Sequence, residues 1–519
     1  MKKIIITCCA ALSMIGATSC GDSFLSVDPP SSVPIDGYYV TEARLMEAVT
    51  AAYDPLHWYD YFAGWAPLNL VFDSMSDDLY VGGGNTGDQG QIHLISQFRS
   101  DPINTIGGAW TGSYSGINRS NLVIADVEEV EGLSEADKNK YIAEARVLRA
   151  WYYSVLWKLW GNLPFYDKNL TFPYITEQKT AKEVYDFMEA DLAEVLDSKV
   201  LPMKREAEWA GRATQAMAAM VYVEYVMYQK DESKYAKALG YMKDIIASGQ
   251  YSLQPFENLW ETEYEWSAET IFDINFIAKG GKRDWGAAQA AGGTVLPAMI
   301  GIDGLKGSPD YVSGWGFGTI AKEAYDAYDT NDKRRDIGIL NIEKYITDNA
   351  AKGITVEYGG RYQNTGFFLR KYLGRIGGND GAVASGDLNW DNNLRIYRYA
   401  ETLLNAAELA LRIGDASAQG YMDQVRTRAG LSSVPVTLDN LLLERRLEFV
   451  GEGKRYFDLV RFGKAAEVLK AKGGKVLENG QYTKDGIPER VQWTENKKYL
   501  PIPQSEIEAA QGTLTQNPY

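Results

Sequence analysis

The chain has 519 residues, of which 45% are hydrophobic and 24% are charged, so it can bury a large core without disulfide bonds. This composition excludes extensive disorder, a collagen-like protein and a polytopic membrane protein. With 53 basic and 69 acidic residues, the formal net charge is −16, which leaves no broad positive field for nucleic acid or anionic lipid. The 34 tyrosines and 13 tryptophans supply many aromatic rings that also carry a hydrogen-bonding group.

The N-terminus has the composition of a secretory signal. A short basic start is followed by a mostly apolar stretch at residues 4–16, which is too short to span a bilayer as a helix, and then by small residues. Cys20 comes next, and residues 17–20 resemble the lipobox of bacterial lipoproteins in a loose form. We therefore expect a lipoprotein signal peptide at residues 1–19, cleaved before Cys20, with lipid attached to Cys20. The alternative is a secretory signal that is cut elsewhere, with Cys20 incidental.

All three cysteines, Cys8, Cys9 and Cys20, belong to this segment. Cleavage before Cys20 leaves one cysteine, so the mature chain could form no internal disulfide, no zinc–cysteine cluster and no cysteine nucleophile. No apolar run of about 18 residues follows, so we expect attachment through lipid alone, without a membrane span.

Helical periodicity marks two parts of the chain. In the first part, Ser134 begins the strongest helix, which ends near Gly161 and Pro164. Paired helices joined by short glycine turns are typical of tetratricopeptide-type arrays, although the 34-residue consensus is poorly kept. Helices are expected at residues 41–59, 134–160, 180–197, 211–229, 234–248, 395–413, 416–429, 438–449 and 455–469.

The intervening chain is irregular. Residues 251–393 are mixed, with one alternating stretch at 270–276 that predicts a strand. The stretches at 280–318 and 374–393 are rich in glycine, as is a loop at 81–88. Long loops are uncommon in compact domains and often carry function when present.

Catalytic motifs are scarce. The two histidines, His57 and His93, have no serine-elbow motif or metal-ligand spacing around them. Paired acids such as Asp77 with Asp78, or Glu261 with Glu265, could serve a glycosidase, but an acidic chain offers many such pairs by chance. We expect no catalytic residue, no metal site and no cofactor.

Two charged segments have structural explanations. In residues 444–459, acidic and basic side chains recur three or four positions apart, which favours ion pairs that hold adjacent helices together. The four aspartates between Asp326 and Asp336 lack the spacing of an EF-hand loop, so a solvated turn is the preferred interpretation.

Aromatic residues in glycine-rich loops suggest a ligand platform. Sugar rings present apolar C–H faces that lie flat on tryptophan or tyrosine, while nearby amides and charged groups bind the hydroxyls. A loop aromatic can equally serve as a lid on the core, whereas Trp151, Tyr152, Trp157 and Trp160 are expected in the core itself. The predicted stacking residues are Trp285, Tyr311 and Trp315, and the predicted polar or secondary contacts are Asp78, Tyr80, Asn85 and Arg283.

Sequence motifs that are specific in combination and order are spread over nearly the whole chain. They are Cys20 with residues 24–30, 144–153 (EARVLRAWYY), 160–164 (WGNLP), 211–214 (GRAT), 398–408 (RYAETLLNAAE), 425–431 (VRTRAGL), 444–464, 500–503 (LPIP) and 515–518 (TQNP). Together they resemble the SusD/RagB family of outer-membrane nutrient-binding lipoproteins. One departure is that a single acid follows Cys20, where surface lipoproteins often carry several.

The resemblance implies a mostly α-helical fold with about eight helices in four tetratricopeptide-like pairs, which support an irregular, loop-rich ligand-binding half with a few short strands. We accordingly expect one domain at residues 20–519. Its scaffold would lie mainly at 41–60, 104–248 and 394–472, and its ligand-binding loops mainly at 73–100 and 251–393.

The resemblance also implies a function. It implies a non-catalytic lipoprotein on the outside of the outer membrane of a Bacteroidetes-type bacterium, acting as a lid on a SusC-like TonB-dependent transporter. The expected ligand is an oligosaccharide or polysaccharide. Family members place aromatic contacts roughly at the loop before Asn104 and at 283–315. The alternatives are a peptide-binding member of the family, a helical-repeat scaffold that binds only protein, and a glycoside hydrolase.

Overall fold

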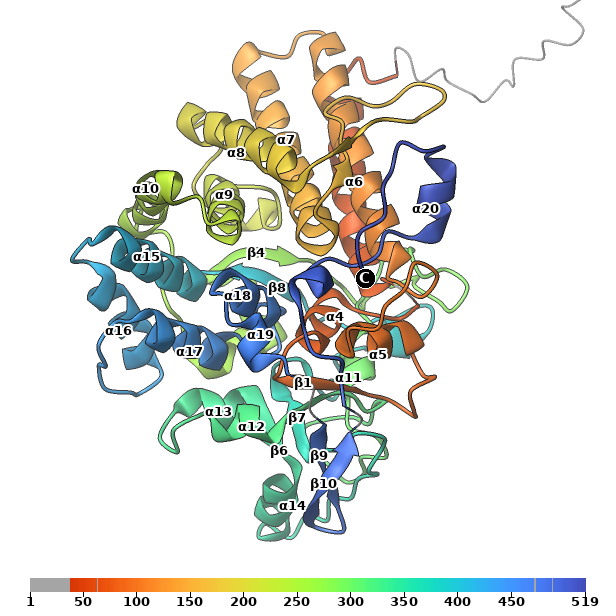
Figure 1. Cartoon of the computed structure of the whole chain (residues 1–519), viewed down its shortest axis with the longest axis vertical. Coiled ribbons are helices and arrows are strands. Elements are labelled where there is room, and N and C mark those ends of the chain that lie inside the picture. Colours follow the sequence, from red (N-terminus) through yellow and green to blue (C-terminus); the bar gives the residue numbers. More distant parts are fainter. Residues whose placement is uncertain (1–37, 63, 471–472, 488) are drawn as a thin grey trace, which may run out of the picture.

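The computed structural model describes residues 38–519, except for residues 63, 471–472 and 488. The expected signal peptide at 1–19 and the expected lipidation site, Cys20, lie outside the described residues. Within the described part, eighteen α-helices and ten short strands alternate with long irregular segments, which confirms the mostly α-helical fold class. Long helices gather along one side of the molecule, and several short strands lie together at one end (Figure 1).

Nine helices stack in an array: α3 (Glu42–Tyr53), α6 (Gly107–Asp126), α7 (Glu135–Trp160), α8 (Ala181–Ser198), α9 (Gln215–Gln229), α10 (Tyr235–Ala247), α15 (Tyr399–Ile413), α16 (Ala418–Arg428) and α17 (Leu438–Phe449). Each helix from α6 to α10 packs on the next, and α3 packs on α6. The array continues across the long irregular segment because α10 packs on α15, which in turn packs on α16 and α17. Stacked pairs of this kind are the predicted tetratricopeptide-like arrangement.

The ends of these helices follow local sequence signals. The Ser134 hydroxyl accepts the Asp137 backbone N–H at the start of α7. At the start of α8, Thr180 and Glu183 form a capping box, in which each side chain accepts the other residue's backbone N–H. The single helix predicted at 41–59 ends early, because Pro55 cannot donate the next helical hydrogen bond, and residues Asp54–Asp60 form a 3₁₀ helix.

The predicted strand at 270–276 is present as β4 (Thr270–Ile274). It pairs antiparallel with β8 (Leu394–Arg398), which stands where periodicity predicted the first residues of a helix. The spacing of apolar residues does not distinguish strand β8 from helix α15. The reason is that β8 is buried throughout and runs directly into that helix.

The irregular half contains a four-stranded sheet in the order β1 (Leu79–Gly82), β5 (Phe317–Ile320), β7 (Phe367–Leu369), β6 (Ile339–Asn341). Its neighbouring strands are antiparallel. In the β1–β5 pair, Gly82 stands opposite Phe317, so the loop after β1 lies beside the loop before β5. This register places the glycine-rich loop at 82–88 next to residues 311–316, where two predicted site residues lie.

Shorter elements complete the fold. The hairpin strands are β2 (Leu163–Pro164) with β3 (Gln178–Lys179) and β9 (Gly474–Glu478) with β10 (Gln481–Ile487). The remaining helices are α4 (Leu68–Ser74), α5 (Gly90–Ser96), α11 (Leu296–Ile300), α12 (Lys322–Asp326), α13 (Lys333–Gly338), α14 (Ile342–Ala350), α18 (Arg455–Arg461), α19 (Ala465–Val468) and α20 (Gln504–Ala509). The helix predicted at 455–469 is divided into α18 and α19 at Gly463, which has a φ of 70°.

The helix array surrounds an aromatic core. Trp151, Tyr152, Trp157 and Trp160 of α7 are all buried, as their helical spacing predicts. The ring of Trp151 meets that of Tyr59 edge-on at 5.0 Å between centroids. This contact packs α7 against the segment after α3. It therefore fixes the position of residue 59, just before the loop that follows residue 60.

A buried ion network joins α17 to its neighbours, as the charge spacing of residues 444–459 predicts. Glu448 is fully buried and accepts hydrogen bonds from Arg334, Arg398 and Arg428. These guanidinium groups overcome the effect of burial and lower the pKa of Glu448. The segment is therefore structural and pins α13, β8 and α16 to α17.

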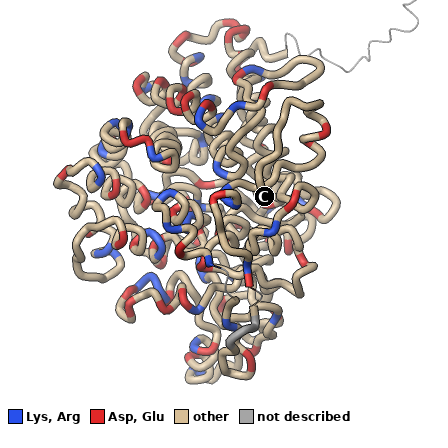
Figure 2. Tube along the Cα trace, viewed as in Figure 1, with Lys and Arg blue, Asp and Glu red and all other residues tan. Residues whose placement is uncertain are grey.

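Acidic and basic residues are interspersed along the chain in the view of Figure 2. Among the described residues, no helix combines the length and the hydropathy needed to cross a bilayer.

Candidate functional site

Two of the predicted stacking residues come together. The indole rings of Trp285 and Trp315 stack, with centroids 5.7 Å apart and an interplanar angle of 28°. Trp65 meets Trp285 edge-on at 5.7 Å, and Tyr61 meets Trp65 edge-on at 5.1 Å. We call these four residues the aromatic platform. Trp285 is 57% exposed, so its ring is available to a ligand.

Backbone hydrogen bonds hold Trp315 on both sides. Its N–H donates to the Ala298 carbonyl at 2.8 Å, and its carbonyl accepts from the Arg361 guanidinium at 2.7 Å. Gly314, the preceding residue, packs directly on Gly301, where an added Cβ would lie 2.7 Å from the Gly314 Cα. Because a side chain at Gly301 would push this backbone away, glycine is needed there to seat the Trp315 loop.

A buried ion pair fixes the other two loops of the platform. The Arg283 guanidinium donates to the Asp60 carboxylate at 2.5 Å and to the His57 carbonyl at 2.7 Å. Asp60 also accepts from the Thr294 hydroxyl and the Val295 N–H. Burial raises the pKa of the Asp60 carboxyl, and the Arg283 charge opposes that shift.

The predicted role of Arg283 is therefore corrected. Its side chain is 0% exposed and cannot meet a ligand at the surface. It positions the loops instead, because Arg283 lies two residues before Trp285 and Asp60 lies one residue before Tyr61.

Polar groups flank the platform on the side of the 82–88 loop. The Gly83 N–H donates to the Gly316 carbonyl at 3.0 Å, which ties this loop to the residue after Trp315. The Asp88 carboxylate accepts the Gly84 N–H at 2.8 Å and lies 3.8 Å from the Arg361 guanidinium. Exposed Asn85 sits at the tip of the same loop and accepts the Gly87 N–H.

Three other predicted residues lie away from the platform surface. Tyr311 is 5% exposed, and its hydroxyl accepts from Arg370 at 2.7 Å, so it covers a small core instead of facing solvent. Asp78 is buried and bound by Arg446 at 2.6 Å. Tyr80 is half-buried with its hydroxyl end against Gly474, and burial raises its pKa to about 12. The burial of Tyr311 and Asp78 does not fit the predicted ligand contacts, whereas the contact predicted for Tyr80 stays a prediction.

The acid pairs considered for glycosidase chemistry are held by arginines. Arg446 and Arg455 bind Asp78 and Asp77, and Arg395 and Arg375 bind Glu265 and Glu261. Among residues 38–519 as far as they are described, no three histidine, cysteine, aspartate or glutamate side chains form a group that could hold a metal ion.

Comparison with known proteins identifies the family. The sequence model of the SusD family matches residues 268–519, and the model described as "Starch-binding associating with outer membrane" matches residues 23–224. The chain belongs to the SusD family. The resemblance inferred from the sequence motifs is confirmed.

Similar proteins match the chain over most of its length. A SusD-like protein of Bacteroides ovatus is 25% identical over 98% of this chain and 93% of its own length. Surface glycan-binding protein A from Bacteroides thetaiotaomicron, solved in complex with laminarihexaose, is 45% identical, with a TM-score of 0.85 over 92% of this chain and 100% of that one. A laminarin-binding SusD-like protein is 28% identical, with a TM-score of 0.79 over 92% of this chain and 100% of its own.

Sequence reasoning missed three residues of the candidate site: Tyr61, Trp65 and Arg361. A signal was available for two of them, since residues 59–65 read YDYFAGW, an aromatic run with a glycine directly after a helix. Arg361 carries no local signal, because it reaches the platform only through the Trp315 carbonyl.

Proposed function

We propose that the chain is a non-catalytic surface lipoprotein that captures oligosaccharide or polysaccharide on the aromatic platform. The observation that carries this proposal is the stacked pair of Trp285 and Trp315, with Trp285 more than half exposed. A flat exposed ring costs little conformational entropy on binding, and it matches the apolar C–H face of a sugar ring. Asn85 and Asp88 stand beside the platform to bind hydroxyl groups.

The proposed ligand is a glucan of the laminarin type. This choice is supported by two similar proteins, one solved with laminarihexaose at 45% identity and one described as laminarin-binding at 28% identity. Trp65 is buried and packs edge-on against Trp285, so it holds the exposed indole of Trp285 in place for a sugar ring.

The proposed location is the outer membrane, with a lipid anchor on Cys20 and the folded chain outside the cell. Support comes from the N-terminal signal and from a family model whose description includes association with the outer membrane. The proposed partner is a SusC-like TonB-dependent transporter that receives the glycan. Stacked helix pairs provide the extended surface that such a partner needs.

Three alternatives compete with this function. A peptide-binding family member would use unpaired backbone groups or complementary charge, whereas the platform offers uncharged rings. A glycoside hydrolase would need two free acids, whereas the four acids considered are bound by arginines. A scaffold that binds only protein would not require an exposed tryptophan stack.

Calorimetric titration separates the alternatives. The full chain is titrated with laminarihexaose, with other hexasaccharides and with a peptide library, and the sugar solutions are then analysed for cleavage. Binding of laminarihexaose without shorter products supports the proposal. Released sugars indicate a hydrolase, exclusive peptide binding indicates the peptide-binding alternative, and co-purification with a transporter without any glycan binding indicates a scaffold.

A further inference from the structure

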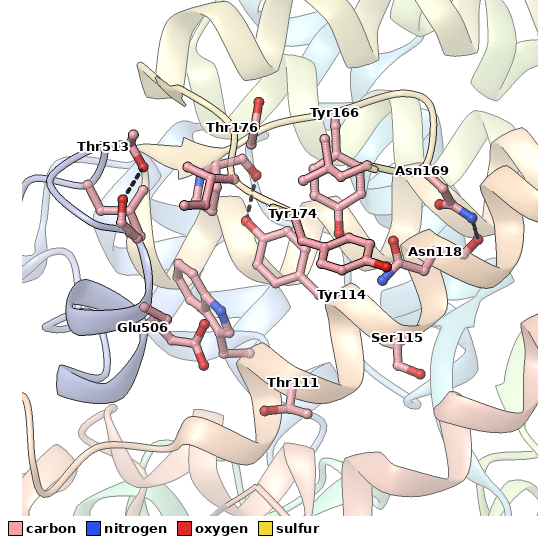
Figure 3. Close-up of a pocket in the computed structure, with 17 residues that line it drawn as sticks. Thr111, Tyr114, Ser115, Asn118, Tyr166, Asn169, Tyr174, Thr176, Glu506 and Thr513 are labelled. Atoms are coloured by element: carbon pink, nitrogen blue, oxygen red, sulfur yellow. Dashed lines mark hydrogen bonds between the residues drawn. The ribbon is translucent and has the colours of Figure 1, made fainter. Parts of the chain in front are cut away.

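A second cavity lies away from the aromatic platform, between α6, the segment at residues 164–176 and the chain around α20 (Figure 3). Its volume is about 640 Å³, within the range of small-molecule sites. The lining residues are Trp110, Thr111, Tyr114, Ser115, Asn118, Pro164, Tyr166, Asn169, Leu170, Tyr174, Ile175, Thr176, Glu506, Ala509, Ala510, Thr513 and Leu514.

Aromatic rings form one wall of this cavity. Tyr114 and Tyr166 stack with centroids 5.9 Å apart, and Trp110 tilts against Tyr114 at 5.1 Å. Tyr174 is 69% exposed at the mouth, and its backbone has a φ of 61°, in the left-handed region that bulky residues avoid. Strain of this kind is concentrated at functional sites, and here it directs a tyrosine ring to the cavity mouth instead of into the core.

Polar side chains lie beside the rings that α6 contributes. Thr111, Ser115 and Asn118 follow one stripe of α6 (Figure 3), next to the stripe of Trp110 and Tyr114 on the same helix. Asn169 donates to the Asn118 carbonyl at 2.9 Å, which fixes the edge of the cavity. The tyrosine stack and this hydroxyl-bearing stripe together match a ligand with an apolar face and a rim of hydroxyl groups.

The charge of the lining residues restricts the chemical class of ligand that the cavity can bind. Among the described lining residues, Glu506 carries the one ionisable acid or base side chain besides the tyrosines. It is half-buried and bonded by the Trp110 indole, and burial raises the pKa of its carboxyl. A lone carboxylate repels phosphates and acidic sugars but accepts hydrogen bonds from the hydroxyl groups of a neutral sugar.

The cavity is connected to the platform through α6. The Gly108 N–H at the start of this helix donates to the Phe62 carbonyl at 2.7 Å, between the platform residues Tyr61 and Trp65. Thr111 begins the cavity stripe one turn later. The start of α6 therefore lies against the platform loop, while later residues of the same helix line the cavity.

We propose that this cavity is a second saccharide-binding site, specific for an uncharged glycan, which adds to the platform in holding long chains. The proposal rests on the proposed function. Two sites on one chain raise the affinity for a polymer that reaches both, without changing the affinity of either site for a short ligand.

The test compares Tyr174→Ala with Phe172→Ala. Both residues are exposed aromatics on the same segment, and their rings meet edge-on at 6.2 Å. Phe172 does not line the cavity, so Phe172→Ala is the matched control for loss of an exposed ring beside it. The full chain is titrated with laminarin and with laminarihexaose, both alone and in a Trp285→Ala/Trp315→Ala background. We expect Tyr174→Ala to weaken laminarin binding at least fivefold. In the Trp285→Ala/Trp315→Ala background it should abolish the laminarin binding that remains. Phe172→Ala should leave the affinity within twofold of its starting value in both backgrounds.

Each other outcome has a defined meaning. If Tyr174→Ala behaves like Phe172→Ala in both backgrounds while the platform variant loses binding, the cavity proposal is wrong and the proposed function stands. If the unaltered chain binds neither glucan, the proposed function fails and the cavity proposal fails with it. Tyr174-dependent binding of peptides without any effect on laminarin also overturns the cavity proposal.

Discussion

Asp60 and Arg283 form an ion pair in which neither side chain is more than 1% exposed, although 223 positions separate them in the chain. One residue after Asp60 the chain enters the loop of Tyr61 and Trp65, and two residues after Arg283 it reaches Trp285. The ion pair therefore joins two segments that each contribute rings to the aromatic platform. Its geometry gives the platform a fixed shape before any ligand arrives, which reduces the entropy lost on binding.

Replacing Arg283 by methionine should destabilise the fold and weaken glycan binding together. Loss of one partner leaves the Asp60 carboxyl buried without its counter-charge, which costs about 3–5 kcal/mol. Adding Asp60→Asn to that variant should restore part of the lost stability, and denaturant unfolding of the two single variants and the double variant measures this coupling. Additive effects of the two substitutions on stability would contradict the coupling, and weaker binding with unchanged stability would contradict a purely positioning role for Arg283.

Replacing Trp285 or Trp315 by alanine should weaken laminarihexaose binding about tenfold or more. Stacking of an aromatic ring in a binding site contributes about 1–3 kcal/mol, and about 1.4 kcal/mol corresponds to tenfold in affinity. Titration calorimetry measures the affinity, and thermal unfolding should show little change for Trp285→Ala because its ring is largely exposed.

Two tryptophans serve as controls for this comparison. Trp209 is 44% exposed on a separate 3₁₀ helix (Ala207–Trp209), so Trp209→Ala should change neither affinity nor stability appreciably. Trp151 lies in the core of α7, so Trp151→Ala should lower the free energy of unfolding by about 3–5 kcal/mol while the folded fraction still binds. Normal binding by both platform variants would place the glycan site elsewhere.

Asp273 should make stability depend on pH. Burial raises the pKa of its carboxyl to about 7, against the opposing charge of Arg395. Between about pH 4 and pH 7 the folded state therefore holds more protons at this site than the unfolded state, so its contribution to stability falls as pH rises. The melting temperature of the unaltered chain minus that of Asp273→Asn should therefore decrease as the pH rises from about 4 to about 7. An increase with pH would contradict the raised pKa.

Cys20→Ser should abolish lipid attachment. The prediction follows from the sequence, because Cys20 is the one cysteine after the apolar segment at 4–16. Mass spectrometry should detect acyl chains on the unaltered protein but not on the variant. After cell fractionation, the variant should no longer be found with the membranes. An unchanged mass and an unchanged membrane fraction would refute the anchor.

Most helices of the array could be predicted because their signals are local, but α6 (Gly107–Asp126), which has no side-chain cap, is not among the expected helices. Ser134 and Thr180 cap helices through residues three positions away, and α17 begins and ends at the residues that the periodicity indicates. Strand β8 could not be recognised in the same way, since a fully buried strand that leads into a helix has no period of its own.

The site could be predicted only in part, because surface exposure is decided by distant residues. Trp285 and Tyr311 occur in similar glycine-rich loops, yet Arg370 and Arg375 cover Tyr311 while Trp285 meets Trp65, which is still more distant in the sequence. The composition of a loop identifies candidate rings but does not tell which of them the rest of the chain will bury.

The most direct test of the platform is a crystal structure of the chain with laminarihexaose. We predict sugar rings within about 4 Å of the indole of Trp285 or Trp315, the distance of van der Waals contact between carbon atoms. A bound hexasaccharide that touches neither indole would contradict the central claim that these two residues capture the glycan.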